Sequence, residues 1–164
     1  MKKIFIDLEK CLLCQSCVVN CSYFYHPENN GIINLQELAT FSLICRRCEE
    51  APCTNSCYHN ALKKDKDGIL KRSNYLCTSC KSCSIACPFG TILVDFLVYL
   101  DSKCDFCIKT QRFLCVESCP YGAVEIKDIE KEDIEAGIFF VSQNLAVHTN
   151  KKWFSDDRIL YRKK

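Results

Sequence analysis

Sixteen cysteines, about a tenth of the 164 residues, fall into four groups along the chain and leave none over. Such a density indicates either a disulfide scaffold or a set of metal sites. The first two groups are Cys11, Cys14, Cys17, Cys21 and Cys45, Cys48, Cys53, Cys57. The last two groups are Cys77, Cys80, Cys83, Cys87 and Cys104, Cys107, Cys115, Cys119. What these groups bind therefore limits what the chain can fold into.

The spacing within the groups is that of iron–sulfur ligands. The first and third groups read C-x2-C-x2-C-x3-C, and Pro88 completes the third as the run that binds [4Fe–4S] clusters in bacterial ferredoxins. The fourth group closes with Cys119-Pro120 but has a wider centre, and the second is also wider. In two-cluster ferredoxins the fourth cysteine of one run binds the other cluster. Four runs therefore predict four [4Fe–4S] clusters in two paired units.

Disulfides and zinc sites are the alternative uses of these cysteines. Asp7, Glu9 and Lys10 interrupt the N-terminal apolar run, so we expect no secretory signal and a cytoplasmic location, where disulfides are rare. Zinc ribbons use two separated cysteine pairs per ion and have no role for a third cysteine three residues later. A zinc-binding structural or regulatory module is the alternative from another functional class.

Charge and hydropathy limit the partners. The formal charge is +2, and four clusters with their thiolates would bring it to about −6, so we expect no nucleic acid. The most apolar stretch, residues 91–100, is too short for a transmembrane segment. His26, His59 and His148 are scattered, and no glycine-rich phosphate loop is present. We therefore predict no catalytic residues and no enzymatic activity for this polypeptide alone.

Short elements are expected around the cysteines. Alternation and apolar runs predict strands over residues 3–8, 92–100, 123–126 and 138–147, and Asp67-Gly68 predicts a hairpin turn over residues 64–68. Helices are expected over residues 18–25 and 128–136. Basic residues near the ligands are candidates for setting cluster potentials. These are Lys10, Arg46, Arg47, Lys81, Lys103 and Lys109.

The last three groups end alike. Cys87-Pro88-Phe89-Gly90-Thr91 aligns with Cys119-Pro120-Tyr121-Gly122-Ala123, and Cys57-Tyr58-His59-Asn60-Ala61 follows more loosely. The similarity indicates internal duplication. Glycine suits a tight turn at this position, and Tyr58 stands where the other two tails have proline.

Three stretches carry a resemblance to a known family: residues 45–53, 80–90 and 103–107, or CRRCEEAPC, CKSCSIACPFG and KCDFC. From about Ile4 to Ile126 the chain resembles the four-cluster ferredoxin-like electron-transfer subunits of molybdenum, tungsten and nickel–iron oxidoreductases. Examples are the iron–sulfur subunits of formate dehydrogenase, formate hydrogenlyase, aldehyde oxidoreductase and CO dehydrogenase. The resemblance implies an α+β fold with short strands and helices and many loops. Two nested bacterial-ferredoxin-like units, each with two [4Fe–4S] clusters, would form one compact body.

The resemblance also implies that the first run pairs with the fourth and the second with the third. The ligand sets would be Cys11, Cys14, Cys17 with Cys119; Cys104, Cys107, Cys115 with Cys21; Cys45, Cys48, Cys53 with Cys87; and Cys77, Cys80, Cys83 with Cys57. Residues 1–44 and 99–130 would form the outer unit, residues 45–98 the inner unit, and residues 131–164 a C-terminal extension. Pairing of consecutive runs remains the alternative, because spacing does not decide between the two.

The function implied by this resemblance is electron transfer in anaerobic metabolism. The chain would relay single electrons between a catalytic subunit and a second electron carrier. The catalytic subunit would be a molybdenum or tungsten enzyme, a hydrogenase or a CO dehydrogenase. A free-standing soluble polyferredoxin is the alternative. Peripheral membrane association and export through a partner are alternatives to a purely cytoplasmic location.

Overall fold

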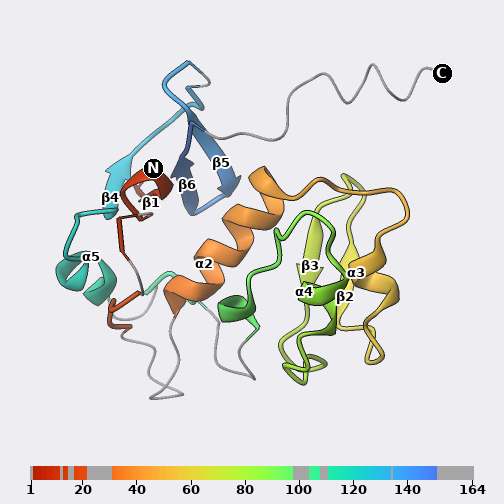
Figure 1. Ribbon diagram of the computed structural model, residues 1–164. Helices are drawn as coiled ribbons and strands as arrows, with labels where there is room; N and C mark the ends of the chain where they lie inside the picture. The colour runs from red at the N-terminus through yellow and green to blue at the C-terminus, as the bar shows by residue number, and fades with distance from the viewer. Residues whose placement is uncertain are drawn as a thin grey trace. The chain divides into compact units, whose positions relative to one another are not determined.

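The structure, a computed structural model, describes residues 2–11, 13, 14, 17–21, 31–97, 104–107, 111–133 and 135–150, which include all sixteen cysteines. They divide into two compact units (Figure 1). Unit 1 contains the described residues up to 35 and from 104 to 150, and unit 2 contains residues 36–97. Both units combine short helices, short strands and loops, as the α+β class predicts.

Unit 1 is built on a four-stranded sheet with the order β4-β1-β6-β5. The strands are β1 (Lys2–Asp7), β4 (Val124–Asp128), β5 (Ile138–Ser142) and β6 (Leu145–His148). β1 pairs antiparallel with β4 and parallel with β6, and β5 and β6 are antiparallel. β1 has a partner strand on each side, and its residues Ile4, Phe5 and Ile6 are all buried. The strand predictions over residues 3–8 and 123–126 are confirmed.

A hairpin takes the place of the single strand predicted over residues 138–147. β5 and β6 turn at Gln143 and Asn144, where Lys3 Nζ donates to the Gln143 carbonyl and the Ile4 N–H to the Asn144 carbonyl at 2.9 Å. Polar residues at the turn interrupt the apolar run. The hairpin lies within the predicted C-terminal extension and belongs to the sheet of unit 1. The predicted unit boundaries themselves stay a prediction.

The helix predicted over residues 128–136 is wrong for the residues described there. β4 continues to Asp128, and Asp133 exchanges two backbone hydrogen bonds with Ile138, at 3.1 and 2.7 Å. The Asp133 carboxylate accepts a further bond from the Ala136 N–H at 3.0 Å. Gly137 has a φ of +69°, and a Cβ there would lie 2.8 Å from the Thr149 carbonyl oxygen. Strand pairing with Ile138 thus replaces helical hydrogen bonds.

Asp7 fixes the chain where the first cysteine group begins. Its Oδ1 accepts bonds from the N–H groups of Glu9 and Lys10, at 3.0 and 3.2 Å, and lies 3.0 Å from His148 Nδ1. Burial acts to raise the pKa of this carboxyl group, but the bonds with His148, Lys10 and Glu9 lower it below 3.8. The short helix α1 (Leu8–Cys11) thereby starts directly after β1 and carries Cys11 at its end.

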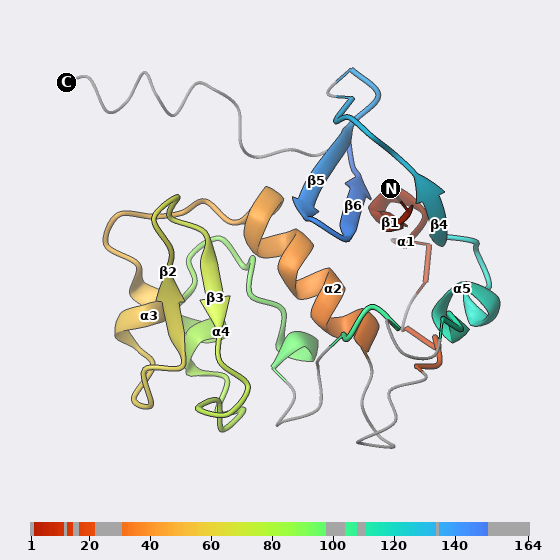
Figure 2. The ribbon, with the colours of Figure 1, turned by 180° about the vertical axis from the view of Figure 1, so that it is seen from behind.

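Unit 2 is organised around the antiparallel hairpin of β2 (Leu62–Lys64) and β3 (Leu70–Arg72). The short helices α3 (Pro52–Asn55) and α4 (Ser82–Ala86) lie beside it in both views (Figures 1 and 2). The π-helix η1 (Thr40–Ile44) continues from α2 (Gly31–Ala39). Buried side chains from η1, β2, β3 and α4, together with residues of the irregular chain after them, form a core cluster of Phe41, Cys45, Leu62, Leu70, Cys83, Ile92 and Leu97. No helix in the described ranges is long and apolar enough to cross a membrane.

Three further sequence predictions concern a hairpin turn, a strand and a helix. The hairpin turn over residues 64–68 is confirmed, with Gly68 at a φ of +74°. The strand predicted over residues 92–100 is wrong in its described part, where the 3-10 helix η2 (Val94–Phe96) forms. Residues 18–21 are not helical, and the rest of the helix predicted over residues 18–25, like residues 98–100, lies outside the described residues.

Side-chain hydroxyls explain why residues 92–97 need no strand partner. Ser84 Oγ donates to the Ile92 carbonyl at 2.6 Å, and Ser79 Oγ donates to the Leu97 carbonyl. Two carbonyl groups that a neighbouring strand could bond are therefore bonded instead by serine hydroxyls of the third cysteine group. Ile92 and Leu97 enter the core, whereas Leu93 and Val94 remain exposed.

The two tight turns at Gly137 and Gly122 allow a matched stability test in unit 1. Both have positive φ, +69° and +57°, but a Cβ at Gly122 meets nothing within 4 Å. We expect Gly122→Ala to cost about 1–2 kcal/mol through backbone strain alone. Gly137→Ala should cost about 1–3 kcal/mol more, because the methyl group also meets the Thr149 carbonyl. Thermal unfolding followed by circular dichroism measures both, and equal losses would contradict the close approach.

Candidate metal centres

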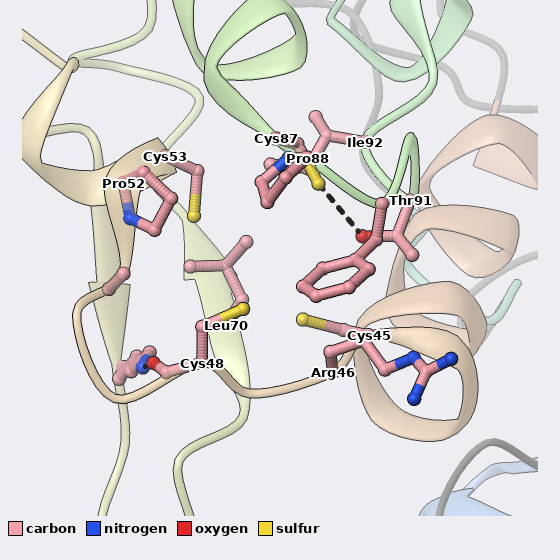
Figure 3. A pocket seen from close by; sticks show the side chains of 13 residues that line it. Cys45, Arg46, Cys48, Pro52, Cys53, Leu70, Cys87, Pro88, Thr91 and Ile92 are labelled. Carbon is pink, nitrogen blue, oxygen red and sulfur yellow. Dashed lines mark hydrogen bonds between the residues drawn. The ribbon is translucent and has the colours of Figure 1, made fainter.

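Four cysteine thiols surround one cavity of unit 2. Figure 3 shows the sulfur atoms of Cys45, Cys48, Cys53 and Cys87 directed into the same space. Cys45 follows η1, Cys53 lies on α3 and Cys87 follows α4, so three elements converge here. Apolar side chains complete the wall: Ala51, Pro52, Leu70, Pro88, Phe89 and Ile92. The cavity holds about 360 Å³, including space open to solvent.

A second cavity of unit 2, of about 350 Å³ including open space, has the same kind of lining. Cys57, Cys77, Cys80 and Cys83 contribute its thiols. Leu62, Leu76 and Leu97 are among its apolar residues, and Arg72, His59 and Lys81 are among the polar ones. Each cavity thus combines the first three thiols of one cysteine group with the last thiol of the other. The second and third groups are interlocked within unit 2.

The pKa values of the thiols show how buried and close these groups are. Burial raises the pKa of Cys83 to about 11, and the nearby Cys77 and Cys57 contribute to the increase. Burial also raises the pKa of Cys53, with contributions from Cys45, Cys87 and Cys48. The exposed Cys80 differs, because hydrogen bonds from Ser82 lower its pKa. The four thiols of the first cavity, and Cys57, Cys77 and Cys83 of the second, therefore lie within electrostatic reach of each other.

In unit 1 the first and fourth cysteine groups come together. Burial raises the pKa of Cys17, and Cys14 and Cys119 raise it further. Burial raises the pKa of Cys104 to about 12, with Cys21, Cys107 and Cys115 contributing. The pKa of Cys115 is raised to about 11 by burial and by Cys107 and Cys21. These neighbourhoods support the nested pairing, which stays a prediction.

Hydrogen bonds hold the two groups of unit 1 in place. The Cys104 N–H donates to Asn34 Oδ1 of α2 at 3.1 Å. The Asn20 N–H, next to Cys21, donates at 2.9 Å to Ser118 Oγ at the end of α5 (Leu114–Ser118). Cys115 lies on α5, and Cys119 follows it. Segments far apart in sequence are thereby fixed beside one another.

Three of the C-x2-C loops share a backbone feature. The residue before the second cysteine is left-handed in each: Arg47 has a φ of 50°, Ser79 of 55° and Phe106 of 56°. Positive φ is uncommon for residues other than glycine and indicates strain that the surrounding structure maintains. Its recurrence at the same place in three cysteine groups indicates a common loop geometry, which residue types alone did not reveal.

The tails of the last three groups form the same turn. Asn60, Gly90 and Gly122 have φ values of 52°, 62° and 57°. Their N–H groups donate to the carbonyl oxygens of Cys57, Cys87 and Cys119, at 3.1, 3.3 and 3.2 Å. The duplication inferred from sequence therefore has a structural counterpart. Asparagine suits the left-handed conformation in the first tail, and the turn forms there although Tyr58 replaces proline.

Each tail also directs a backbone N–H at its cysteine sulfur. The Ala61 N–H lies 3.3 Å from Cys57 Sγ, and the Ala123 N–H lies 3.2 Å from Cys119 Sγ. The Thr91 N–H bonds to Cys87, and Thr91 Oγ1 lies 3.4 Å from Cys87 Sγ. Burial would raise the pKa of Cys87, but these bonds lower it. Hydrogen bonds of this kind stabilise the thiolate, the form that binds metal.

The basic residues predicted to lie near the ligands occupy different places. Arg46 lines the first cavity with its guanidinium turned away and 5.2 Å from the Phe89 ring (Figure 3), and Lys81 lines the second. Arg47 donates to the carbonyls of Ser42 and Asp67 at 2.8 and 3.2 Å, and Lys10 lies 3.7 Å from Glu125. Lys103 and Lys109 lie outside the described residues.

Sequence reasoning did not single out two other basic residues. Lys64 lines the first cavity and donates to the Cys48 carbonyl, and Arg72 lines the second cavity. The alternation of side chains along β3 could have identified Arg72. Arg72 lies two residues after the core residue Leu70 in β3 and therefore points to the same side.

The histidines and acidic residues add no further metal site in the described part of the chain. His59 lines the second cavity, His148 bonds to Asp7, and His26 lies outside the described residues. Within that part, no three cysteine, histidine, aspartate or glutamate side chains gather closely enough for a single metal ion. The four thiols of each cavity instead surround a wider space. Soft thiol donors, an apolar wall and N–H groups on sulfur suit an iron–sulfur cluster.

Comparison with known proteins decides the cofactor class. Residues 36–129, more than half of the chain, match the family described as the 4Fe-4S dicluster domain. This protein belongs to that family. Membership confirms [4Fe–4S] clusters as the predicted cofactor class. The match spans the second, third and fourth cysteine groups.

Relatives cover most of the chain. YsaA of Escherichia coli (strain K12), whose name refers to electron transport, is 33% identical over 143 residues, covering 78% of this chain and 90% of the relative. A subunit of the anaerobic dimethyl sulfoxide reductase from the same organism is 29% identical, with 77% and 73% covered. Thiosulfate reductase electron transfer subunit PhsB of Salmonella typhi is 29% identical, with 79% and 77% covered. These names agree with the predicted electron-transfer role.

The raised thiol pKa values give the iron-free chain a defined pH dependence. Cys83, Cys104 and Cys115 have folded-state pKa values of about 11, 12 and 11, above the ordinary 9.0. Their contribution to stability is complete below pH 9 and is lost as pH rises through 11–12, because the unfolded thiols ionise first. We expect the melting temperature of reduced, iron-free protein to fall above about pH 9.

The iron-loaded protein is the control for this measurement. Its thiolates are already ionised by metal binding, so its melting temperature should change less over the same pH range. Iron-free protein that melts at one temperature from pH 8 to pH 11 would contradict buried neutral thiols.

Proposed function

We propose that the chain holds four [4Fe–4S] clusters, two in each unit, and relays single electrons between a catalytic redox subunit and a second carrier. The interlocking of cysteine groups carries the proposal. Each cavity of unit 2 takes three thiols from one group and one from the other, the arrangement by which two-cluster ferredoxins share their fourth ligands. Family membership and the relatives' names support the same function.

The proposed ligand sets follow the nested pairing. In unit 2 they are Cys45, Cys48, Cys53, Cys87 and Cys57, Cys77, Cys80, Cys83, the thiols of the two cavities. In unit 1 they are Cys11, Cys14, Cys17, Cys119 and Cys21, Cys104, Cys107, Cys115. The proximity of Cys17 to Cys119, and of Cys104 to Cys21, supports these sets. These ligand sets pair the first cysteine group with the fourth and the second with the third, and not consecutive groups.

The chain's own residues would prepare the site for one-electron chemistry. A bound [4Fe–4S] cluster supplies a reversible one-electron couple. Leu70, Ile92 and Phe89 keep the first cavity apolar, and the Thr91 N–H stabilises negative charge on Cys87. Left-handed residues in the loops hold the thiols at fixed positions, which limits rearrangement when charge changes. These features suit electron transfer and provide no group that would act on a substrate.

We propose a reductase of the molybdenum and tungsten class as the catalytic partner. A subunit of a dimethyl sulfoxide reductase and the electron transfer subunit of a thiosulfate reductase are named among the relatives. Those names favour a reductase over the hydrogenase and CO dehydrogenase that the resemblance also allows. The cytoplasm stays the predicted compartment.

Substitution of the cysteine that one group contributes to the cluster of the other group tests the ligand sets. We expect Cys87→Ala to release Cys45, Cys48 and Cys53, because their cluster loses its fourth ligand, and to leave the other clusters bound. Anaerobic alkylation of the loaded variant, followed by peptide mapping, identifies the released thiols. Cys57→Ala is the matched variant and should release Cys77, Cys80 and Cys83. Alkylation of Cys104, Cys107 and Cys115 in Cys87→Ala would support consecutive pairing instead.

Anaerobic purification from the native source tests the function. We expect a brown complex with a larger redox subunit and about sixteen iron atoms for each copy of this chain. Elemental analysis, electron paramagnetic resonance after dithionite and identification of the co-purifying protein measure these points. An iron-rich 18.9 kDa monomer would favour a free polyferredoxin, and a colourless zinc protein would contradict the proposal.

A further inference from the structure

Arg72 and Glu37 form a buried ion pair in unit 2. Arg72 Nε lies 2.5 Å from Glu37 Oε1, and Arg72 Nη2 lies 3.1 Å from Glu37 Oε2. The two side chains are only 1% and 3% exposed. Removing two charges from water is expensive, and apolar replacements of such pairs are often neutral or stabilising. Stability alone is therefore a weak reason for this pair.

The pair adjoins the second cavity. Arg72 lines it and bonds through its guanidinium to the Cys77 thiol. The guanidinium thus contacts both the Glu37 carboxylate and the thiol of a proposed ligand. Arginine stays protonated at all working pH values and carries five donors, so it can serve both partners together. A hydrogen bond that the guanidinium donates to a thiolate is charge-assisted.

We propose that the Arg72–Glu37 pair sets the reduction potential of the cluster held by Cys57, Cys77, Cys80 and Cys83. The inference rests on the proposed function. Reduction adds one electron, supplied by dithionite in a titration, and leaves the cluster and its thiolates one unit more negative. The buried guanidinium favours that reduced state, and the Glu37 carboxylate opposes it while fixing the guanidinium in place. Burial strengthens both effects, because water does not screen them.

Neighbouring cations differ from Arg72 in exposure. Lys71, the adjacent residue of β3, has a 64% exposed side chain that lies 3.1 Å from Asp65. Lys81 also lines the second cavity but is exposed to solvent. Water and salt screen such charges. Lys71 therefore offers a matched control in which one positive charge is removed one residue away, on the opposite side of the strand.

Opposite shifts in two variants test the inference. We expect Arg72→Gln to lower one cluster potential, with at least a tenfold fall in the equilibrium constant for reduction, or about 59 mV for one electron. Glu37→Gln should raise the same potential, because it leaves the guanidinium uncompensated. Lys71→Gln should leave every potential within a twofold change in that constant. Dithionite titration of loaded protein, followed by electron paramagnetic resonance, measures each step.

The double variant Arg72→Gln with Glu37→Gln covers the case in which a lone buried charge prevents folding. It leaves no charge unpaired, so it should fold and load iron. Its potential should lie between those of the native protein and Arg72→Gln, because the guanidinium bond to Cys77 sulfur is lost. Unchanged potentials in the iron-loaded double variant, or shifts of one sign in both single variants, would overturn the inference. Absence of iron from the native protein would instead overturn the proposed function.

Discussion

Thiol groups from separate cysteine groups come together in both units, and in unit 2 they line small apolar cavities. The short strands and helices position the segments that carry these thiols. β1 ends at Asp7 so that Cys11 follows within one turn, and Asn34 and Ser118 hold the loops around Cys104 and Cys21. In unit 2 the hairpin supplies an apolar wall to each cavity, Leu70 to the first and Leu62 to the second. Most of the cysteines lie on loops, outside the short helices and strands.

The cysteines themselves belong to the interior. Cys45 and Cys83 are part of the core of unit 2, and Cys53 and Cys87 pack against it. Without metal, Cys53 and Cys83 are neutral thiols whose raised pKa values record their burial. Metal binding replaces them by ligated thiolates, so cluster loading and folding stability are coupled. The proposed ligands are therefore also part of the packed interior of unit 2.

The cysteine groups, the central strand β1, the hairpin at Gly68 and the tails of the last three groups could be predicted because each has a local pattern. Helix α2 was missed although Ile32, Leu35 and Ala39 are buried at helical spacing. The failures at residues 92–97 and 128–136 have another cause. Serine hydroxyls of Ser79 and Ser84 bond the first segment, and a backbone bridge between Asp133 and Ile138 closes the second, and local propensity gives no sign of these hydrogen bonds. Arg72 and Glu37 are likewise joined only by tertiary structure.

The interlocked thiol groups also constrain how the protein is made. A chain leaves the ribosome from its N-terminus, yet the first cavity of unit 2 is lined by Cys87 as well as by Cys45, Cys48 and Cys53. In unit 1 the thiol beside Cys17 belongs to Cys119, in the last of the four cysteine groups. With the proposed ligand sets, the early cysteines would stay reduced and without their full set of partners until the later ones had been synthesised. Iron delivery would then be a late event, and a chain truncated before Cys87 would leave the first cavity without its fourth thiol.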